Sequence, residues 1–228
     1  MLPKYPRTIH SFVKREGRLT QSQQQAIENQ WPEFGVNFSE QLIDMPTLFG
    51  RDAETILEIG FGNGESLFQM AQDNPHKNFF GIEVHRPGVG HLLRLVEKTN
   101  CTNLHISIRD AIDVLEHQIA DNSIDRLQLF FPDPWHKKKH NKRRIIQDTF
   151  IAEVARILTP DGTFHLATDW EHYAKHMLKT LNNSDLFFNL SEDQTFVPKP
   201  DERPTTKFER RGHKLGHGVW DLMFSKIS

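Results

Sequence analysis

From residue 54 onward, strand-like runs alternate with helix-like runs, and this alternation constrains the fold more than any other feature of the chain. The strand-like runs are short and rich in β-branched or aromatic residues, whereas the segments between them space apolar residues three and four apart. This order is typical of an α/β protein with a doubly wound, mostly parallel sheet. Seven strands are predicted, at residues 54–60, 78–84, 103–108, 124–131, 162–168, 186–192 and 218–226.

Two regions depart from this alternation. Residues 1–50 are interpreted as a basic N-terminal arm and a helical extension with turns at 21–30 and 39–49, so we expect one α/β domain over residues 51–228. Residues 193–217 hold three prolines and show little periodicity, which predicts a long loop. Loops of this length are uncommon unless they carry function, and the alternative is a disordered surface excursion.

Apolar runs and cysteine content restrict the class of protein. No run approaches the roughly 20 apolar residues that a membrane span needs, and the N-terminus lacks the apolar core of a signal peptide. Cys101 is the single cysteine, which excludes an intramolecular disulfide framework and fits a reducing compartment. We therefore expect a cytoplasmic protein that does not contact a membrane.

The formal net charge of −2 hides a strong segregation of charge along the chain. Residues 1–18 carry +4, residues 136–144 carry +6 and residues 199–214 carry +3, so the rest of the chain sums to −15. The average charge argues against a uniformly basic nucleic-acid binder, but three basic segments on an acidic body indicate a polyanionic partner. For a run of cations taken alone, the alternative is a solvated surface.

The first predicted strand runs into a glycine-rich turn, EIGFGNGES, that suits a nucleoside cofactor. Gly60, Gly62 and Gly64 allow a sharp turn and the close approach of a ligand to the main chain. The dinucleotide fingerprint would place its third glycine at Glu65, where an acidic side chain opposes a pyrophosphate. With Glu58 before it, the turn instead favours S-adenosylmethionine, a cationic cofactor without phosphates.

Two further acids follow the next two predicted strands. Glu83 lies 23 residues after Gly60, where a carboxylate can accept hydrogen bonds from both ribose hydroxyls of either cofactor. Asp110 could accept from an adenine amine, or it could cap the helix that follows it. Because the carboxyl ends of parallel strands share one edge of a sheet, we expect Glu58, Glu83 and Asp110 to converge there.

The fourth predicted strand ends in FPDPWHKKKHNKRR, which combines an acid, an aromatic ring and a dense run of cations. Asp133 stands between two prolines that restrict the backbone, so a stiff loop aims its carboxylate. Trp135 offers a stacking face for a base. Placed directly behind these two residues, the cations of 137–144 are predicted to form a strip that binds phosphates.

Two more segments are predicted to meet the substrate. Asp169 and Trp170 follow the fifth strand, with a helix-capping aspartate and a core tryptophan as the alternative. In the long loop, residues 205–209 combine Thr and Glu, which can accept from a base edge, with a lysine that can hold phosphate. No spacing of His or Cys indicates a metal site.

Together these segments resemble the bacterial tRNA (guanine-N7-)-methyltransferase family, class I enzymes that use S-adenosylmethionine to modify guanosine 46 in the variable loop of tRNA. The resemblance covers nearly the whole chain and rests on EIGFGNGESLFQMA, GIEVHRPGV, FPDPWHKKKHNKRR, LATDWEHY and TKFERRGHKLGHGVWDLMF. The segment IHSFVKREGRLTQSQ resembles the N-terminal arm of the family. FPDPW with its basic run and the TKFE loop are specific to the family, whereas the glycine turn belongs to methyltransferases at large.

Carried over by position, the resemblance implies a Rossmann-like methyltransferase domain with Asp133 as the catalytic candidate, between cofactor and target base. The chain departs from the family at His136, where proline is frequent. The implied cofactor-binding residues are Glu58, Gly60, Gly62, Gly64, Glu83, Asp110 and Asp133. The implied substrate-binding residues are Lys137, Asp169, Thr206, Lys207, Phe208 and Glu209, and the implied RNA-contacting residues are Lys139, His140, Asn141, Lys142, Arg143 and Arg144.

Three functions are weighed against these residues. The leading one is a tRNA N7-guanine methyltransferase, with tRNA as partner and no obligate protein partner or metal. A nicotinamide-dependent dehydrogenase is disfavoured by Glu65 and by the lack of an evident hydride-transfer partner. A non-catalytic RNA-binding module on the same fold would require loss of the cofactor acids, and Glu58, Glu83 and Asp110 are all present.

Overall fold

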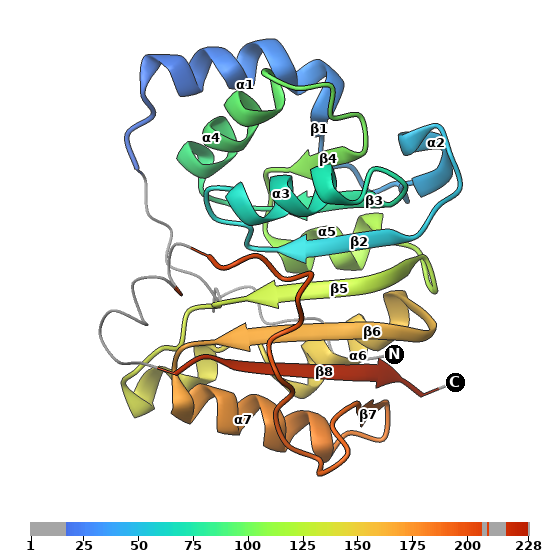
Figure 1. Cartoon of the computed structure of the whole chain (residues 1–228), viewed down its shortest axis with the longest axis vertical. Helices are drawn as coiled ribbons and strands as arrows, with labels where there is room; N and C mark the ends of the chain where they lie inside the picture. Colours follow the sequence, from blue (N-terminus) through green and yellow to red (C-terminus); the bar gives the residue numbers. More distant parts are fainter. Residues whose placement is uncertain (1–16, 207–208, 210–217, 228) are drawn as a thin grey trace.

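The computed structural model, which describes residues 17–206, 209 and 218–227, contains one mixed sheet with helices on both faces (Figure 1). The strand order is β1-β4-β3-β2-β5-β6-β8-β7, and in the described part the two pairs that β8 forms, with β6 and β7, are antiparallel while the other pairs are parallel. This arrangement confirms the doubly wound, mostly parallel sheet. The strands are β1 (Gly35–Val36), β2 (Thr55–Ile59), β3 (Asn78–Ile82), β4 (Leu104–Ser107), β5 (Ile124–Phe130), β6 (Leu158–Thr168), β7 (Phe187–Asn189) and β8 (Trp220–Lys226).

The sheet has one strand more than the seven predicted, because β1 pairs in parallel with β4 at the edge. Two residues are too few to show an alternating pattern, so tertiary placement alone creates this strand. Placement comes from α1 (Gln21–Phe34), which starts with a capping box between Thr20 and Gln23 and packs on α4 (Arg86–Val96). Residues 17–50 thus contribute one strand and two helices to the fold, and residues 1–16 of the predicted arm lie outside the described residues.

The other helices are α2 (Met45–Phe49), α3 (Glu65–Asp73), α5 (Ala111–Gln118), the 3-10 helix η1 (Lys138–Arg143), α6 (Asp148–Ile157) and α7 (Glu171–Asn182). Helix α6 starts three residues later than its apolar pattern, since Ile146 is fully buried from a loop. Strand β6 starts earlier than predicted, at Leu158, because Leu158 pairs with Ile124 before the chain bulges out through the turn residues 159–162. No helix in the described ranges is long and apolar enough to cross a membrane.

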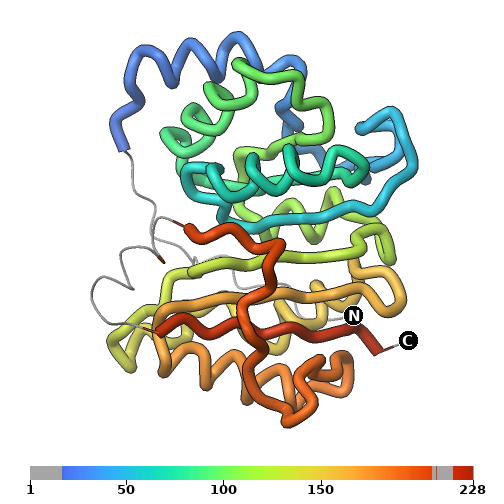
Figure 2. The backbone as a smooth tube through the Cα atoms, viewed as in Figure 1, coloured from blue at the N-terminus to red at the C-terminus, as the bar shows by residue number. Residues whose placement is uncertain are grey.

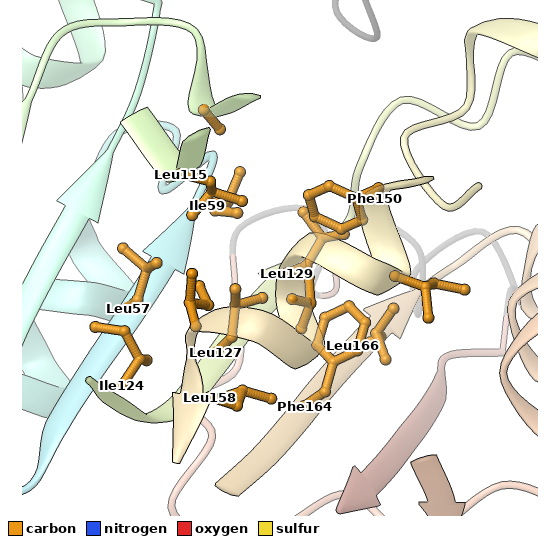
Figure 3. Packing of buried hydrophobic residues seen from close by; sticks show 14 of the residues in the cluster. Leu57, Ile59, Leu115, Ile124, Leu127, Leu129, Phe150, Leu158, Phe164 and Leu166 are labelled. Carbon is orange, nitrogen blue, oxygen red and sulfur yellow. The ribbon is translucent and has the colours of Figure 1, made fainter. Parts of the chain in front are cut away.

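Two apolar clusters lie on opposite faces of the sheet. One face packs against α5, α6 and α7, and Figure 3 shows side chains such as Leu127, Leu129 and Leu166 meeting Leu115 and Phe150. The opposite face of β2, β3 and β4 is covered by α1, α3 and α4. Successive side chains of each central strand enter the two cores in turn, so every residue of β2 and β3 is buried and their sequences are nearly continuously apolar.

Over β5, β6 and β8, an extended segment takes the place of a helix on that second face. Residues 193–206, here called the strap, run from the end of β7 across these strands (Figure 2). The strap is irregular apart from a bridge in which the Val197 N–H donates to the carbonyl of Asp221 at 3.0 Å. An ion pair of 2.7 Å between Arg126 of β5 and Glu202 fixes it further along. The long loop predicted here is therefore confirmed over its described part, where it packs on the sheet.

Candidate functional site

The carboxyl ends of β2 to β6 form the edge at which the predicted site residues gather. Strand β2 lies between β3 and β5, so the strand order reverses there, and ligands of open α/β sheets bind at such a reversal point. Glu58 lies near the end of β2, while Glu83 and Asp110 follow β3 and β4. Asp133 and Asp169 follow β5 and β6. The topology thus brings the five predicted acids to one edge of the sheet.

The glycine turn between β2 and α3 has the backbone that its sequence predicts. Gly62 has a φ of 61° and Gly64 a φ of 75°, both in the left-handed region that favours glycine. A Cβ atom at Gly64 would also stand 2.7 Å from the side chain of Leu92 in α4. The turn therefore needs glycine for its conformation and for the close packing of α4.

Glu83 is held by three backbone N–H groups at the end of β3. Its Oε2 accepts from Gly62 at 2.8 Å, and its Oε1 accepts from Val84 at 2.7 Å and His85 at 2.9 Å. Each carboxylate oxygen offers about two acceptor sites, so Oε2 keeps capacity for one more donor. Glu83 thus links the glycine turn to the next loop and can still accept from a hydroxyl.

Glu58 is a buried acid whose Oε2 has no hydrogen-bond partner among the described residues. Burial, followed by the charge of Glu83, raises the pKa of Glu58 to about 8. A buried acceptor without a donor is costly unless a ligand supplies one. The residues at this edge therefore fit a ligand that carries hydrogen-bond donors or positive charge, as S-adenosylmethionine does.

Asp110 caps the helix that follows β4. Its Oδ1 accepts from the N–H of Ile112 at 3.1 Å, at the first turn of α5. The capping interpretation of Asp110 is therefore confirmed, and contact with an adenine amine stays a prediction. The two roles are compatible, because a carboxylate has more acceptor sites than one cap uses.

The loop that carries Asp133 is bounded by two unusual backbone conformations. Phe131 has a φ of 52° and Trp135 a φ of 46°, values that are rare for aromatic residues. Such strained conformations persist where the surrounding structure fixes them, often at functional sites. Burial raises the pKa of Tyr173 in α7, and the negative charge of Asp133 adds to that shift.

Arg144 differs from the prediction that it contacts RNA, because its side chain is only 2% exposed. Its Nε donates to the carbonyl of Pro134 at 2.9 Å, and its Nη2 lies 3.1 Å from Nδ1 of His172. The guanidinium also stacks over Tyr173 at 4.7 Å, and burial lowers its pKa. Arg144 therefore supports the Asp133 loop from its buried side. The backbone turns at Arg144, where η1 ends, and this turn directs the Arg144 side chain inward.

The cations before Arg144 lie on the surface, as a phosphate-binding strip requires. Lys137, Lys139, Lys142 and Arg143 are exposed, and η1 displays most of them on one short helix. Arg143 stacks over the ring of Trp135 at 4.9 Å. Partial desolvation and the surrounding cations lower the pKa of the half-buried His140, whose neighbour Asn141 is also half-buried.

The loops after β5 and β6 meet through their aromatic residues. The ring of His136 packs edge-on against Trp170, with centroids 4.2 Å apart. Helix α7 is capped at Trp170, so the helix-capping interpretation of Asp169 is wrong, while Trp170 does pack against the core in part. Asp169 is half-buried beside this contact. The geometry thus joins the Asp133 and Asp169 loops into one surface.

At the end of the strap, Glu209 is buried and paired with Arg203. The Nη1 of Arg203 donates to Glu209 Oε2 at 2.8 Å, and its Nη2 donates to Oε1 at 3.1 Å. The Glu209 N–H donates to Thr206 Oγ1 at 3.1 Å, and the Thr206 N–H donates to Glu209 Oε2 at 3.3 Å. These two reciprocal hydrogen bonds fix Thr206 against Glu209. The predicted substrate residues Lys207 and Phe208 lie outside the described residues.

Sequence reasoning missed Arg203 and its second partner, Asp221 of β8. The sequence indicates only that this face is polar, because β5, β6 and β8 alternate apolar with polar residues, and Gln128, His165 and Asp221 occupy the second face. Because buried polar side chains need hydrogen-bond partners, the segment that covers this face must itself be polar, unlike an apolar helix. Within the described part of the chain, no group of three or more His, Cys, Asp or Glu side chains could hold a metal ion.

Comparison with known proteins gives matches at the level of family and fold. Residues 52–222 match a family described as putative methyltransferase. The chain is 58% identical over 225 residues to the tRNA (guanine-N(7)-)-methyltransferase of Shewanella oneidensis, covering 99% of this chain and 94% of that protein.

Solved structures share the fold at low sequence identity. The 16S rRNA methyltransferase KamB matches with a TM-score of 0.58 at 13% identity, over 82% of this chain and 95% of that one. A putative methyltransferase from Streptococcus mutans in complex with SAH matches with a TM-score of 0.51 at 10% identity, over 77% and 90%. These likenesses identify the Rossmann-like fold of the described sheet.

Proposed function

The chain belongs to the tRNA (guanine-N7-)-methyltransferase family, and we propose that it transfers a methyl group from S-adenosylmethionine to N7 of guanosine 46 in tRNA. The observation that carries this proposal is the convergence of the cofactor acids and the Asp133 loop at the strand-order reversal, directly beside the exposed cations of η1. The relatives' names supply the substrate class. A tRNA substrate also favours a cytoplasmic location.

The cofactor would lie across the glycine turn, between β2 and β3. Glu83 is fixed by three N–H groups and keeps one acceptor site for a ribose hydroxyl. The unpaired oxygen of Glu58 offers an acceptor to a cationic group, and Asp110 offers one to the base. When bound, S-adenosylmethionine supplies an electrophilic methyl group.

Asp133 would orient the guanine and would not act as its base. N7 of neutral guanine carries a lone pair and no proton, so nothing needs to be removed before methyl transfer. The carboxylate can accept from the N1 and N2 donors of the base, and its charge favours the cationic product ring. The strained, prolyl-flanked loop fixes the carboxylate before the substrate arrives, which is what such stabilisation requires.

The surface beyond Asp133 would hold the RNA. Lys137, Lys139, Lys142 and Arg143 supply exposed charge for phosphates, and Trp135 with Trp170 supplies aromatic surface beside them. Asp169 follows β6, and Thr206 and Glu209 are tied to the same edge through Arg203 and Asp221. We retain the sequence-based assignment of these residues to the substrate, except for Arg144, which acts on the loop.

The direct test is methyl transfer to a defined RNA. The protein is incubated with methyl-labelled S-adenosylmethionine and unmodified tRNA, and the label is mapped by reduction and aniline cleavage, which cuts at 7-methylguanosine. We expect cleavage at position 46 alone. A tRNA with adenosine at position 46 is the control and should stay unlabelled, whereas label that appears on both RNAs, or on neither, contradicts the proposal.

A further inference from the structure

Arg203 is the largest side chain among the most deeply buried residues, and it lies where the strap crosses the carboxyl ends of β5 and β6 and the amino end of β8. Its Nε and Nη2 donate to the two carboxylate oxygens of Asp221 at 2.7 and 2.8 Å. Because Asp221 pairs with Ala167, near the end of β6, this contact is at the active edge of the sheet. Arg203 thus anchors the strap to the same edge as the proposed site.

The same guanidinium binds Glu209 through Nη1 and Nη2, so it bridges two buried carboxylates. Glu209 is hydrogen-bonded to Thr206 of the strap, while Asp221 belongs to the sheet. Without the positive charge between them, the two acids would be left buried without adequate compensation, which is strongly unfavourable. Asp221 also contacts His165 at 2.9 Å, which fixes its orientation.

Arg203 also lies next to the start of the Asp133 loop. Its Cζ is 5.8 Å from the ring centroids of Phe130, the last residue of β5, and Phe131, the first residue of that loop. One side chain therefore contacts the sheet, Glu209 and the first residue of the loop that carries Asp133.

We propose that Arg203 is a positioning residue for methyl transfer, which sets the place of Thr206 and Glu209 relative to Asp133. This role rests on the proposed function of these two residues in binding the substrate. Only a planar guanidinium with its several donors can bind two carboxylates in this way, whereas a lysine supplies one point charge. Glu209 is thus fixed by a group that need not touch either substrate.

The test uses R203K, E209Q and the double variant, with methyl transfer to tRNA measured at saturating cofactor. We expect R203K to lower kcat/KM for tRNA about 100-fold, with the Kd for S-adenosylmethionine within about twofold of wild type. In the E209Q background the same replacement should cost about threefold or less, because the group on which Arg203 acts is already altered. Equal losses in both backgrounds would mean that Arg203 acts on stability alone.

E202Q is the matched control, since it removes an ion pair from the same strap without touching Glu209. Its kcat/KM should stay within about twofold of wild type, and R203K behaving like E202Q would overturn the proposal. If R203K does not fold, D221N takes its place, and it should lower kcat/KM about tenfold in the wild-type background and not in E209Q. Methyl transfer to N7 by the wild-type protein is measured first, and its absence would overturn the proposed function. If the wild-type protein does transfer the methyl group but R203K or D221N is unimpaired, only the positioning role of Arg203 is overturned.

Discussion

Asp133 is half-buried in a loop whose two ends, at Phe131 and Trp135, have left-handed backbone. We expect D133A to lower kcat for methyl transfer by about 10²- to 10³-fold, because one fixed charge that stabilises a developing charge has an effect of that size. The Kd for S-adenosylmethionine should change by less than about threefold, since the other acids and the glycine turn remain. Single-turnover methylation and equilibrium cofactor binding measure the two quantities.

The control for D133A is D185N, an exposed aspartate before β7 at the opposite edge of the sheet. Its turnover should match wild type. A D133A variant that keeps near wild-type turnover would remove Asp133 from the catalytic role. If D133A loses cofactor binding as well as turnover, the result would assign Asp133 to the binding of the cofactor.

Glu58 makes the stability of the protein depend on pH. Its pKa rises from 4.5 to about 8 on folding, so between these values the folded chain holds a proton that the unfolded chain releases. The contribution of Glu58 to stability therefore decreases as the pH rises through this window. E58Q removes this dependence, and at pH 8.5 we expect it to be more stable than wild type by on the order of 4 kcal/mol.

Denaturant unfolding of E58Q and wild type at pH 5 and pH 8.5 measures this effect. The difference in free energy of unfolding between the two proteins should be small at pH 5 and should grow with pH. E97Q, which replaces an exposed glutamate at the end of α4, should follow wild type throughout. A constant difference between E58Q and wild type would show that Glu58 ionises normally in the fold.

At the scale of elements, the end of η1 gives two adjacent arginines, Arg143 and Arg144, different environments and different proposed roles. Arg143 is exposed, so R143A should weaken tRNA binding and reduce the slope of log K against log salt by about 0.9, the value for one phosphate contact. Arg144 is buried under the Asp133 loop, so R144M should leave the slope unchanged and lower both kcat and stability, the latter by about 1–3 kcal/mol.

Filter binding across a salt series, single-turnover kinetics and thermal melting distinguish the two arginine variants. K98A is the matched control, because Lys98 is an exposed cation near the C-terminal end of α4, at the opposite edge of the sheet. Its slope should equal that of wild type. If R144M changes the slope as R143A does, the buried position of Arg144 does not describe the enzyme in complex with RNA.

The elements also show how far the sequence predicts this fold. Strands β2 and β3 are predicted because both of their faces are buried, which produces continuous apolar runs between turn residues. Strand β1 is not predicted, since its two residues have no period, and β6 is predicted to start late because turn residues lie inside its bulge.

For the candidate site, the acids at the strand ends are predictable because parallel topology alone brings them together. The inward turn of Arg144 is not, since a run of cations has no pattern that marks the buried one. The cluster of Arg203, Asp221 and His165 is not predictable either. Asp221 is 18 residues from Arg203 and 56 from His165, and their contact depends on how the strap crosses the sheet. Pairings of this kind follow from tertiary structure and not from local sequence.

At the scale of the whole molecule, the net charge of −2 hides two local surfaces with opposite charge. Acids gather at the ends of β2, β3 and β4, where a cationic cofactor is proposed to bind, and cations gather on η1, beyond β5. The two surfaces share one edge of the sheet but differ in exposure, because Glu58 and Glu83 are buried and the η1 lysines are not. Salt screens exposed charges far more than buried ones.

Salt should therefore separate the two binding reactions. Between 50 and 200 mM KCl we expect the Kd for tRNA to rise more than 10-fold, because three phosphate contacts already give a slope of about −2.7. The Kd for S-adenosylmethionine should stay within about twofold, since its proposed contacts are buried or made by the backbone. Calorimetric titration of each ligand over the salt series tests this, and an equal loss of both affinities would mean that the cofactor depends on the exposed cations. If instead the Kd for tRNA does not change with salt, the η1 cations are a solvated surface and do not bind phosphates.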